Sequence, residues 1–393
     1  MGDYTTLADL PQYPEALALV AAQDIAAGTC LLRVPFGWMV STQQFDESPL
    51  LGNHRFHISL ADAETADLRK KVVLLLFARH PLAPPILSRF AKVCDPASFD
   101  HIPLLWSNDD EALSLCGPLS AVKAEVQRER REVSAMRSEL LPLVEAVLPT
   151  LAPIFTVLFC RVAVAVCNSR VFQLDYEVEV SADDESKSEN SPKEDEDEDE
   201  DEEEEPEYRV CSQRVLVPGV DLMNHAVNSE GRNVETRWAV PEDCDVATDK
   251  SSLALEIFAV RAIAKGEELC HEYHAGESDY FLLHYGFVPD PNPDEVLVLS
   301  EAPSRRRWES NMTEDLPRTQ HRPTLKARRA CVVTELQRLQ RLSENAARTD
   351  ATVHACAVRR LHANAKAVLD AALGRIDALL QGRKKRGTPP KNR

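Results

Sequence analysis

A short phrase of sequence occurs twice in this chain and constrains the fold more than any other feature. The phrase I-A-x-G-x-x-L occupies residues 25–31 and recurs, at identical spacing, over residues 263–269. Apolar runs flank each copy, and a glycine between such runs is typical of a turn between two strands. We therefore predict two similar β-hairpins, the first built from Glu15–Ala22 and Cys30–Phe36. Chance similarity of short hairpins is the alternative interpretation.

Between the two copies the sequence shows the apolar periodicity of helices. Apolar residues recur at spacings of three and four, interrupted by prolines. The segments with this pattern are 68–77, 111–115, 119–148 and 151–166. They predict an all-helical block, about residues 56–166, inserted into a β-rich domain. The most apolar window, 151–167, is interrupted by Arg161 and is too short to span a bilayer comfortably.

The β character returns after the helical block, on both sides of a strongly acidic segment. Strands are expected through Leu174 and Tyr176 and again over residues 209–217. Residues 183–207 hold 17 acids and 2 lysines, a net charge of −15 out of −19, so the rest of the chain is nearly neutral. A segment with so few apolar residues cannot offset its ordering entropy. We predict a disordered loop over about 182–207, and leave open that a basic partner uses it.

The composition shifts again after a proline-rich stretch at residues 289–293. Apolar stripes at helical spacing predict at least two amphipathic helices in a C-terminal lobe, residues 290–382. The last segment, 383–393, reads as a flexible basic tail; both a nuclear import signal and a solubilising terminus stay open for it. Residues 10–289 would form the main domain.

Several classes of function find no support in the sequence. The ten cysteines are scattered and form no CxxC pair, which favours buried free thiols in a reducing compartment. The N-terminal residues lack the basic and then apolar order of a secretion signal, so we expect an intracellular protein of the cytoplasm or nucleus. The usual phosphate, dinucleotide, zinc-protease and serine-hydrolase motifs are missing.

Two stretches gather the side chains that could do chemistry. The apolar run 217–225 ends in Asp221, Asn224 and His225, and the segment 266–287 offers phenols, notably Tyr273 and Tyr285. Buried tyrosine hydroxyls usually need a partner. We expect these stretches to form the walls of one site.

A metal centre is the competing interpretation of the same region. His271 and His274 could join Asp221 and His225 as ligands. The spacing, however, matches no familiar ligand pattern, and the segment 271–274 is expected to alternate its side chains between two faces. We therefore predict no metal.

The motifs, taken together and in order, resemble those of SET-domain protein methyltransferases, most closely the Rubisco large-subunit methyltransferase-like branch. The resemblance rests on four segments and on an IPLLWS segment within the helical block, and it extends from about Glu15 to Leu380. The four segments are the first hairpin, S-R-V-F at 169–172, D-L-M-N-H at 221–225 and E-Y-H-A-G-E-S-D-Y-F-L-L-H-Y-G-F at 272–287.

This resemblance implies an α+β fold: small twisted sheets around a pseudoknot, a helical insertion and a C-terminal α-helical lobe that engages substrate. It implies S-adenosylmethionine as cofactor, held by residues from the hairpin, the S-R-V-F segment and the D-L-M-N-H motif, namely Glu15, Ala16, Leu17, Ser169, Asn224 and His225. Tyr273 aligns with the catalytic tyrosine. Substrate-binding positions would be Arg170, Asp221, Tyr285 and Phe287. The family usually shows Gly-x-Gly where this chain has Ala16-Leu17-Ala18.

Structural roles remain open for two of these residues. Arg170 could only pair with Asp221, and Tyr285 could be a core phenol with a satisfied hydroxyl. The resemblance implies methyl transfer to a lysine of a protein substrate by a monomeric enzyme, without membrane or nucleic-acid partners. Two other functions stay open: methylation of a protein histidine, and a non-catalytic binding module with the same fold.

Overall fold

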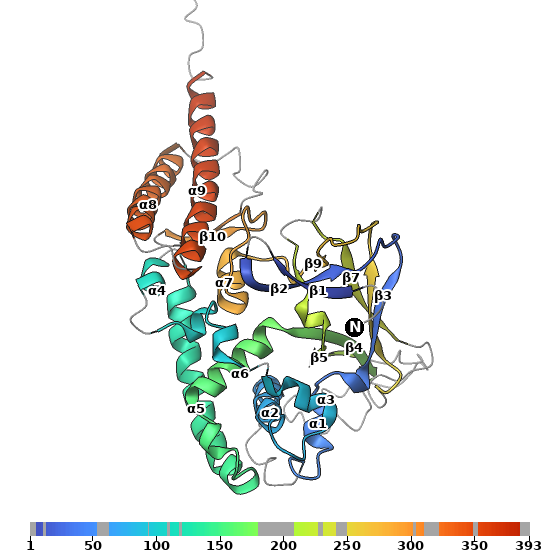
Figure 1. The fold of residues 1–393 in the computed structure, drawn as a ribbon. Helices are drawn as coiled ribbons and strands as arrows, with labels where there is room; N and C mark the ends of the chain where they lie inside the picture. Colours follow the sequence, from blue (N-terminus) through green and yellow to red (C-terminus); the bar gives the residue numbers. More distant parts are fainter. Residues whose placement is uncertain are drawn as a thin grey trace, which may run out of the picture. The chain divides into compact units, whose positions relative to one another are not determined.

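The structure of the 393-residue chain is a computed structural model (Figure 1). It describes residues 5–10, 13–52, 63–92, 94–107, 111–117, 120–179, 208–226, 231–240, 250–301, 304–309, 322–348 and 353–385. The chain forms two compact units. The β unit comprises residues 1–44, 170–223 and 233–269, and the helical unit comprises residues 45–169, 224–232 and 270–393.

The β unit consists of small antiparallel sheets. Two of them are two-stranded, with the orders β1-β2 and β4-β5, and the third has the order β3-β8-β7. The strands are β1 (Thr5–Leu10), β2 (Tyr13–Ala21), β3 (Cys30–Pro35), β4 (Val171–Glu179), β5 (Tyr208–Leu216), β7 (Val234–Ala239) and β8 (Ala254–Ala259).

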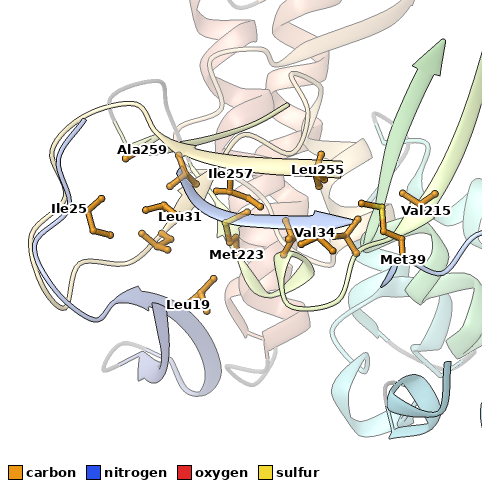
Figure 2. Packing of buried hydrophobic residues seen from close by; sticks show 14 of the residues in the cluster. Leu19, Ile25, Leu31, Val34, Met39, Val215, Met223, Leu255, Ile257 and Ala259 are labelled. Atoms are coloured by element: carbon orange, nitrogen blue, oxygen red, sulfur yellow. The ribbon is translucent and has the colours of Figure 1, made fainter. Parts of the chain in front are cut away.

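The core of the β unit is formed by apolar side chains from several of its strands. In β3, Leu31 and Val34 are both buried although they are three positions apart, and the pairing of β3 with β8 shifts its register between Cys30 and Leu32. Leu255 and Ile257 of β8 belong to the same apolar cluster (Figure 2). Each such side chain contributes about 1.5–3 kcal/mol when fully removed from water.

The repeated phrase forms a pair of matching turns that bond to each other. Ile25 and Ile263 exchange backbone hydrogen bonds, each N–H reaching the other's carbonyl oxygen at 2.9 Å. Gly28 and Gly266 both adopt positive φ, +79° and +82°, a backbone conformation that glycine tolerates best. The expected turns are therefore present.

The pairing of the flanking strands differs from the prediction. Neither copy closes a simple hairpin, because β2 pairs with β1 while β3 pairs with β8. A turn signal in the sequence specifies where the chain reverses, but the apolar faces of more distant strands decide which strands pair.

The strands β4 and β5 pair along their whole length, from Val171 opposite Leu216 to Glu179 opposite Tyr208. They confirm the two strands predicted on either side of the acidic segment. The predicted loop itself, 182–207, lies outside the described residues.

The helical unit contains the inserted block and the C-terminal helices. Its helices beyond the short α1 (Gln43–Asp46) are α2 (Ala63–Phe77), α3 (Pro85–Ser88), α4 (Glu111–Leu115), α5 (Val122–Val147), α6 (Val157–Ser169), α7 (Ser278–Tyr285), α8 (Arg322–Arg348) and α9 (Val353–Lys385). Two short strands, β6 (Asn224–His225) and β9 (Cys270–His271), and a hairpin of β10 (Val296–Glu301) and β11 (Ser304–Glu309) complete it. The α+β class is therefore confirmed, including the C-terminal helices.

The C-terminal helices pack against the inserted block as well as against each other. One buried cluster joins Val122 and Val126 of α5 to Leu282 of α7 and to Val358 and Leu361 of α9. A second cluster holds α8 and α9 side by side (Figure 1). The domain boundary expected at residue 289 stays a prediction.

The structure also bears on the C-terminal tail and on membrane insertion. Helix α9 continues to Lys385, so the first residues of the predicted tail are helical. No helix in the described part of the chain has both the length and the apolar character required to cross a membrane.

Candidate active site

Two short strands bring the two chemistry-bearing stretches together within the helical unit. β6 and β9 run parallel, with Asn224 opposite Cys270 and His225 opposite His271. The Ala226 N–H extends the pairing by donating to the His271 carbonyl oxygen at 2.9 Å. Residues some 45 positions apart in sequence thus become neighbours, and the chain after β9 starts beside the Asn-His pair.

His225 is fixed by the backbone of Tyr273. The Tyr273 N–H donates to Nδ1 of His225 at 3.1 Å, so Nδ1 is the acceptor and the ring proton belongs on Nε2. Burial lowers the pKa of His225 to about 4. Burial, with a smaller contribution from nearby His225, also lowers the pKa of His271 to about 4. Both imidazoles are therefore neutral at neutral pH.

Aromatic rings surround this imidazole. The ring of His225 lies 5.3 Å from that of Tyr273, 4.7 Å from Phe281 and 5.7 Å from Phe287, measured between centroids. Tyr273 in turn lies 4.8 Å from Tyr285. These separations are typical of favourable aromatic pairs. We call this set the aromatic cluster; its members are His225, His271, Tyr273, Phe281, Tyr285 and Phe287.

Helix α7 and the glycine that ends it determine where Tyr285 and Phe287 lie. Gly286 has φ +75° and caps the helix, donating its N–H to the Leu282 carbonyl oxygen at 3.1 Å. A Cβ at this position would lie 2.5 Å from Cδ2 of His101 and 2.7 Å from its carbonyl oxygen. The glycine of the Y-G-F phrase is therefore required for both its conformation and the close approach of His101.

Tyr285 is a neutral phenol. Burial, supported by the neighbouring Tyr280, raises its pKa above the ordinary value. Its ring contacts those of Phe281 and Phe287 at centroid distances of 5.9 and 6.2 Å. The predicted pair Tyr285 and Phe287 thus lies with Tyr273 in one half-buried aromatic cluster.

The opposite end of α7 is held by a buried polar network that the sequence did not reveal. Ser278 Oγ donates to Glu295 Oε2, and it accepts hydrogen bonds from Asn364 Nδ2 at 3.0 Å and Asn292 Nδ2 at 3.2 Å. Asn364 also donates to the Pro289 carbonyl oxygen at 2.8 Å. We call Ser278, Asn292, Glu295 and Asn364 the α7 anchor.

Burial raises the pKa of Glu295 in this anchor to about 7. No local motif indicated these residues, because Asn364 comes from α9, 86 positions beyond Ser278. Phe281 was also missed, although its place one turn before Tyr285 on an apolar helix was a usable signal.

In the β unit, Arg170 and Asp221 form an ion pair. Nη1 of Arg170 donates to the Asp221 carbonyl oxygen at 2.8 Å and to its Oδ2 at 3.3 Å, and the Gly219 N–H donates to Oδ1 at 2.9 Å. Burial raises the pKa of Asp221, and Arg170 partly offsets that rise. The structural role left open for Arg170 is thus observed, while its role in substrate binding stays a prediction.

The remaining predicted cofactor residues lie in β2 and at the end of α6. Glu15, Ala16 and Leu17 are part of β2, but their side chains are outside the described residues. Ala18 beside them is fully buried. Ser169 ends α6, where its Oγ donates back to the Ala165 carbonyl oxygen at 2.7 Å.

The structure gives the histidines considered as metal ligands different surroundings. His271 is buried in the aromatic cluster, whereas His274 is exposed and its ring centroid lies 4.6 Å from that of Tyr280. Within the described ranges, no group of three or more histidine, cysteine, aspartate or glutamate side chains could hold a metal ion.

Comparison with known families agrees with this geometry. The profile of the SET domain matches residues 17–274, which is more than half of the chain. The chain belongs to the SET-domain family. That range includes β2 from Leu17 onward, the Asn224-His225 pair and Tyr273, whereas α7 and α9 follow it. A search of curated proteins by sequence gives no match.

Solved structures share the fold over almost the whole chain. The SET domain of LSMT, bound to lysine and AdoHcy, has a TM-score of 0.58 and 15% identity, covering 99% of this chain and 92% of that one. Rubisco LSMT bound to AdoMet gives 0.56 and 15%, and its complex with sinefungin and monomethyllysine gives 0.59 and 14%, each covering 99% of this chain and 93% of that one. At such identity the likeness concerns the fold.

Proposed function

We propose that this chain is an S-adenosylmethionine-dependent protein-lysine N-methyltransferase whose reaction centre is the aromatic cluster. The observation that carries the proposal is the contact between the Asn-His strand and Tyr273, in a chain of the SET-domain family. The family membership supplies the reaction class. The cluster supplies the neutral, aromatic surroundings that this class of reaction needs.

The chemistry of the residues present fits a sulfonium cofactor. Faces of Tyr and Phe rings attract a cation within about 6 Å of the ring centre. The imidazoles nearby are neutral, so they do not repel a positive sulfur. Asn224 adds an amide, which can donate to a carboxylate and accept from an ammonium group. We assign Asn224 and His225 to the cofactor, with backbone contacts from Glu15, Ala16 and Leu17 and a neighbouring position for Ser169.

When bound, S-adenosylmethionine supplies an electrophilic methyl group, whose bond to sulfur breaks as its bond to the lysine nitrogen forms. The enzyme's task is therefore to align a neutral amine with that methyl group and to exclude water. A desolvated aromatic surrounding lowers the pKa of an entering lysine and so favours the neutral amine. The rings of Tyr285 and Phe287 would form this surrounding.

Tyr273 is the residue we assign to catalysis. Its backbone is fixed by His225 and its ring by His225, His271 and Tyr285. A phenol held this firmly can direct its oxygen at the methyl group and the amine through weak C–H···O contacts. We assign Arg170 and Asp221 to the lysine pocket on the basis of the family resemblance.

A methyl-labelling experiment tests this proposal. The full chain is incubated with radiolabelled S-adenosylmethionine and a cell extract, and the labelled protein is mapped by mass spectrometry. We expect methyl groups on a lysine side chain. Methyl groups on histidine would replace the lysine assignment and keep the methyltransferase. Absence of transfer together with no thermal stabilisation by S-adenosylhomocysteine would leave only a binding module with this fold.

A further inference from the structure

A groove in the helical unit gathers positive charge without serving the aromatic cluster. It lies between α4, α5 and α6 and has a volume of about 570 Å³. The polar and charged residues that matter for its chemistry are Ser114, Lys123, Gln127, Arg130, Arg131 and Arg161. Four of these six are cationic, and no carboxylate is among the described residues that line it.

The exposed cations of the groove are not neutralised within the described parts of the chain. Lys123 and Arg131 project from α5 and make no ion pair with any described residue. Arg128 on the same helix behaves differently, because it pairs with Glu125 at 2.6 Å and with Glu132 at 2.8 Å. The glutamates that pair with Arg128 do not line the groove, so they leave its exposed cations unneutralised.

Arg161 contributes a buried donor. It is the one charged residue of α6, whose neighbours Cys160 and Val162 are fully buried. Its Nε is buried and has no hydrogen-bond partner among the described residues. A guanidinium donor withdrawn from water without an acceptor is unfavourable, so an anionic ligand in the groove would satisfy it.

Arg130 is a buried cation of the groove whose side chain is held in place by backbone carbonyl groups. It is only 7% exposed, and its guanidinium donates to the carbonyl oxygens of Leu104 at 3.3 Å, Pro103 at 3.2 Å and Trp106. These bonds fix the side chain beside the 3-10 turn η5 (Pro103–Leu105). A charge held in one place costs no further ordering when a ligand binds.

We propose that this groove binds a compact anion carrying several phosphate groups. Its volume falls within the range of about 300–1,000 Å³ that small-molecule sites occupy. Four cations in that space would be neutralised best by a ligand with a high density of negative charge. Each phosphate group carries up to about two negative charges at neutral pH. Peptide carboxylates are spaced along an extended chain at about 3.5 Å per residue, so a peptide segment fits this density less well. Arginine forks also match phosphate oxygens in a bidentate manner.

Calorimetric titration of the full chain with inorganic tripolyphosphate tests the proposal at near-physiological salt. We expect one binding site, with affinity rising from phosphate to pyrophosphate to tripolyphosphate. The double variant Lys123→Gln/Arg131→Gln and the single variant Arg161→Gln should each weaken binding by about 10-fold or more, since charge-assisted bonds are lost. The matched control Arg128→Gln should change tripolyphosphate affinity by no more than about 2-fold, because that arginine is already paired with glutamates.

Further control experiments distinguish binding in the groove from binding elsewhere on the chain and from binding of other ligands. Neutralising the four basic residues 383–386 should leave tripolyphosphate affinity unchanged; loss of binding there would assign it to the tail and overturn the proposal. The exposed Lys123 and Arg131 keep the test valid should Arg161→Gln fail to fold. Equal binding by the double variant and the parent, no binding at all, or tighter binding of a glutamate peptide or duplex DNA than of tripolyphosphate would each contradict the proposal.

Discussion

Two clusters flank helix α7, one half-buried and aromatic and one buried and polar, and burial shifts the pKa values of their titratable groups in opposite directions. The aromatic cluster lies where the helix ends, at Tyr285, and the α7 anchor lies where it begins, at Ser278. Burial lowers the pKa of both imidazoles of the first cluster to about 4, while it raises the pKa of Glu295 in the second to about 7. In both clusters burial therefore disfavours the charged form of the titratable groups. The difference fits the proposed roles of the two clusters: the first would surround the reaction, and the second would hold the helix that carries part of it.

The largest expected effect is on the rate of methyl transfer and comes from a change in the aromatic cluster. Tyr273→Phe should lower the single-turnover rate of methyl transfer by roughly 100-fold or more, because the lost contact acts mainly in the transition state. The fold and the affinity for S-adenosylhomocysteine should stay nearly unchanged, since the ring still packs. Rapid-quench measurement of the first methyl transfer checks this.

Tyr285→Phe is the matched control for that variant. As a wall residue, it should alter the extent of methylation or the substrate KM more than the first transfer rate. A Tyr273→Phe enzyme as fast as the parent would remove the catalytic assignment of Tyr273.

The pH dependence of stability should reveal the α7 anchor. Glu295 has an ordinary pKa of 4.5 and a pKa of about 7 in the fold. Between these values the folded chain binds more protons than the unfolded chain, so the anchor's contribution to the free energy of unfolding is complete below pH 4.5 and is lost as pH rises through 7. The loss is about 3 kcal/mol. Glu295→Gln mimics the protonated form and should therefore remove this pH-dependent loss of stability.

Denaturant unfolding of the parent and of Glu295→Gln across pH 4.5–7.5 checks this prediction. The neutral imidazoles give the opposite slope, with stability lost as pH falls below the ordinary histidine value of 6.5 toward 4. That slope is common to both proteins and cancels in the difference between them. A difference that does not change with pH would show that Glu295 titrates normally.

A smaller loss should follow from cutting the link between α9 and α7. Asn364→Ala removes the donor to Ser278 and to Pro289, and should cost about 1–3 kcal/mol of unfolding free energy. Gln340→Ala on α8, which removes an exposed hydrogen bond to Glu344, should change the unfolding free energy by no more than about 0.5 kcal/mol. Chemical denaturation of both variants decides the matter. A loss for Asn364→Ala as small as the control would mean that α9 does not anchor α7.

The sequence predicted most of the elements but not how they combine. Periodicity gave α2, α5, α6 and the C-terminal helices, and the repeated I-A-x-G-x-x-L phrase gave the turns at Gly28 and Gly266. Strand partners were wrong for β2 and β3, because pairing depends on apolar faces far apart in sequence. The extension of α9 through Lys385 was also missed.

The candidate site shows the same limit. His225, Tyr273, Tyr285 and Phe287 were predicted from motifs and lie in one cluster. The α7 anchor was invisible, because its residues are ordinary in sequence and acquire meaning only when α9 meets the start of α7. Desolvation, which sets the pKa of each buried group, follows from that tertiary packing and from no local pattern.

The most direct test of the central claim is calorimetric titration of S-adenosylhomocysteine into three proteins: the parent, Asn224→Ala and Tyr273→Phe. The proposed function predicts one site in the parent and in Tyr273→Phe. In Asn224→Ala it predicts affinity reduced by roughly 10- to 100-fold, because removing an amide that bonds the ligand leaves its partners unmatched at a cost of about 1–3 kcal/mol. No binding to the parent, or equal binding to all three proteins, would contradict the assignment of the Asn224-His225 strand to the cofactor.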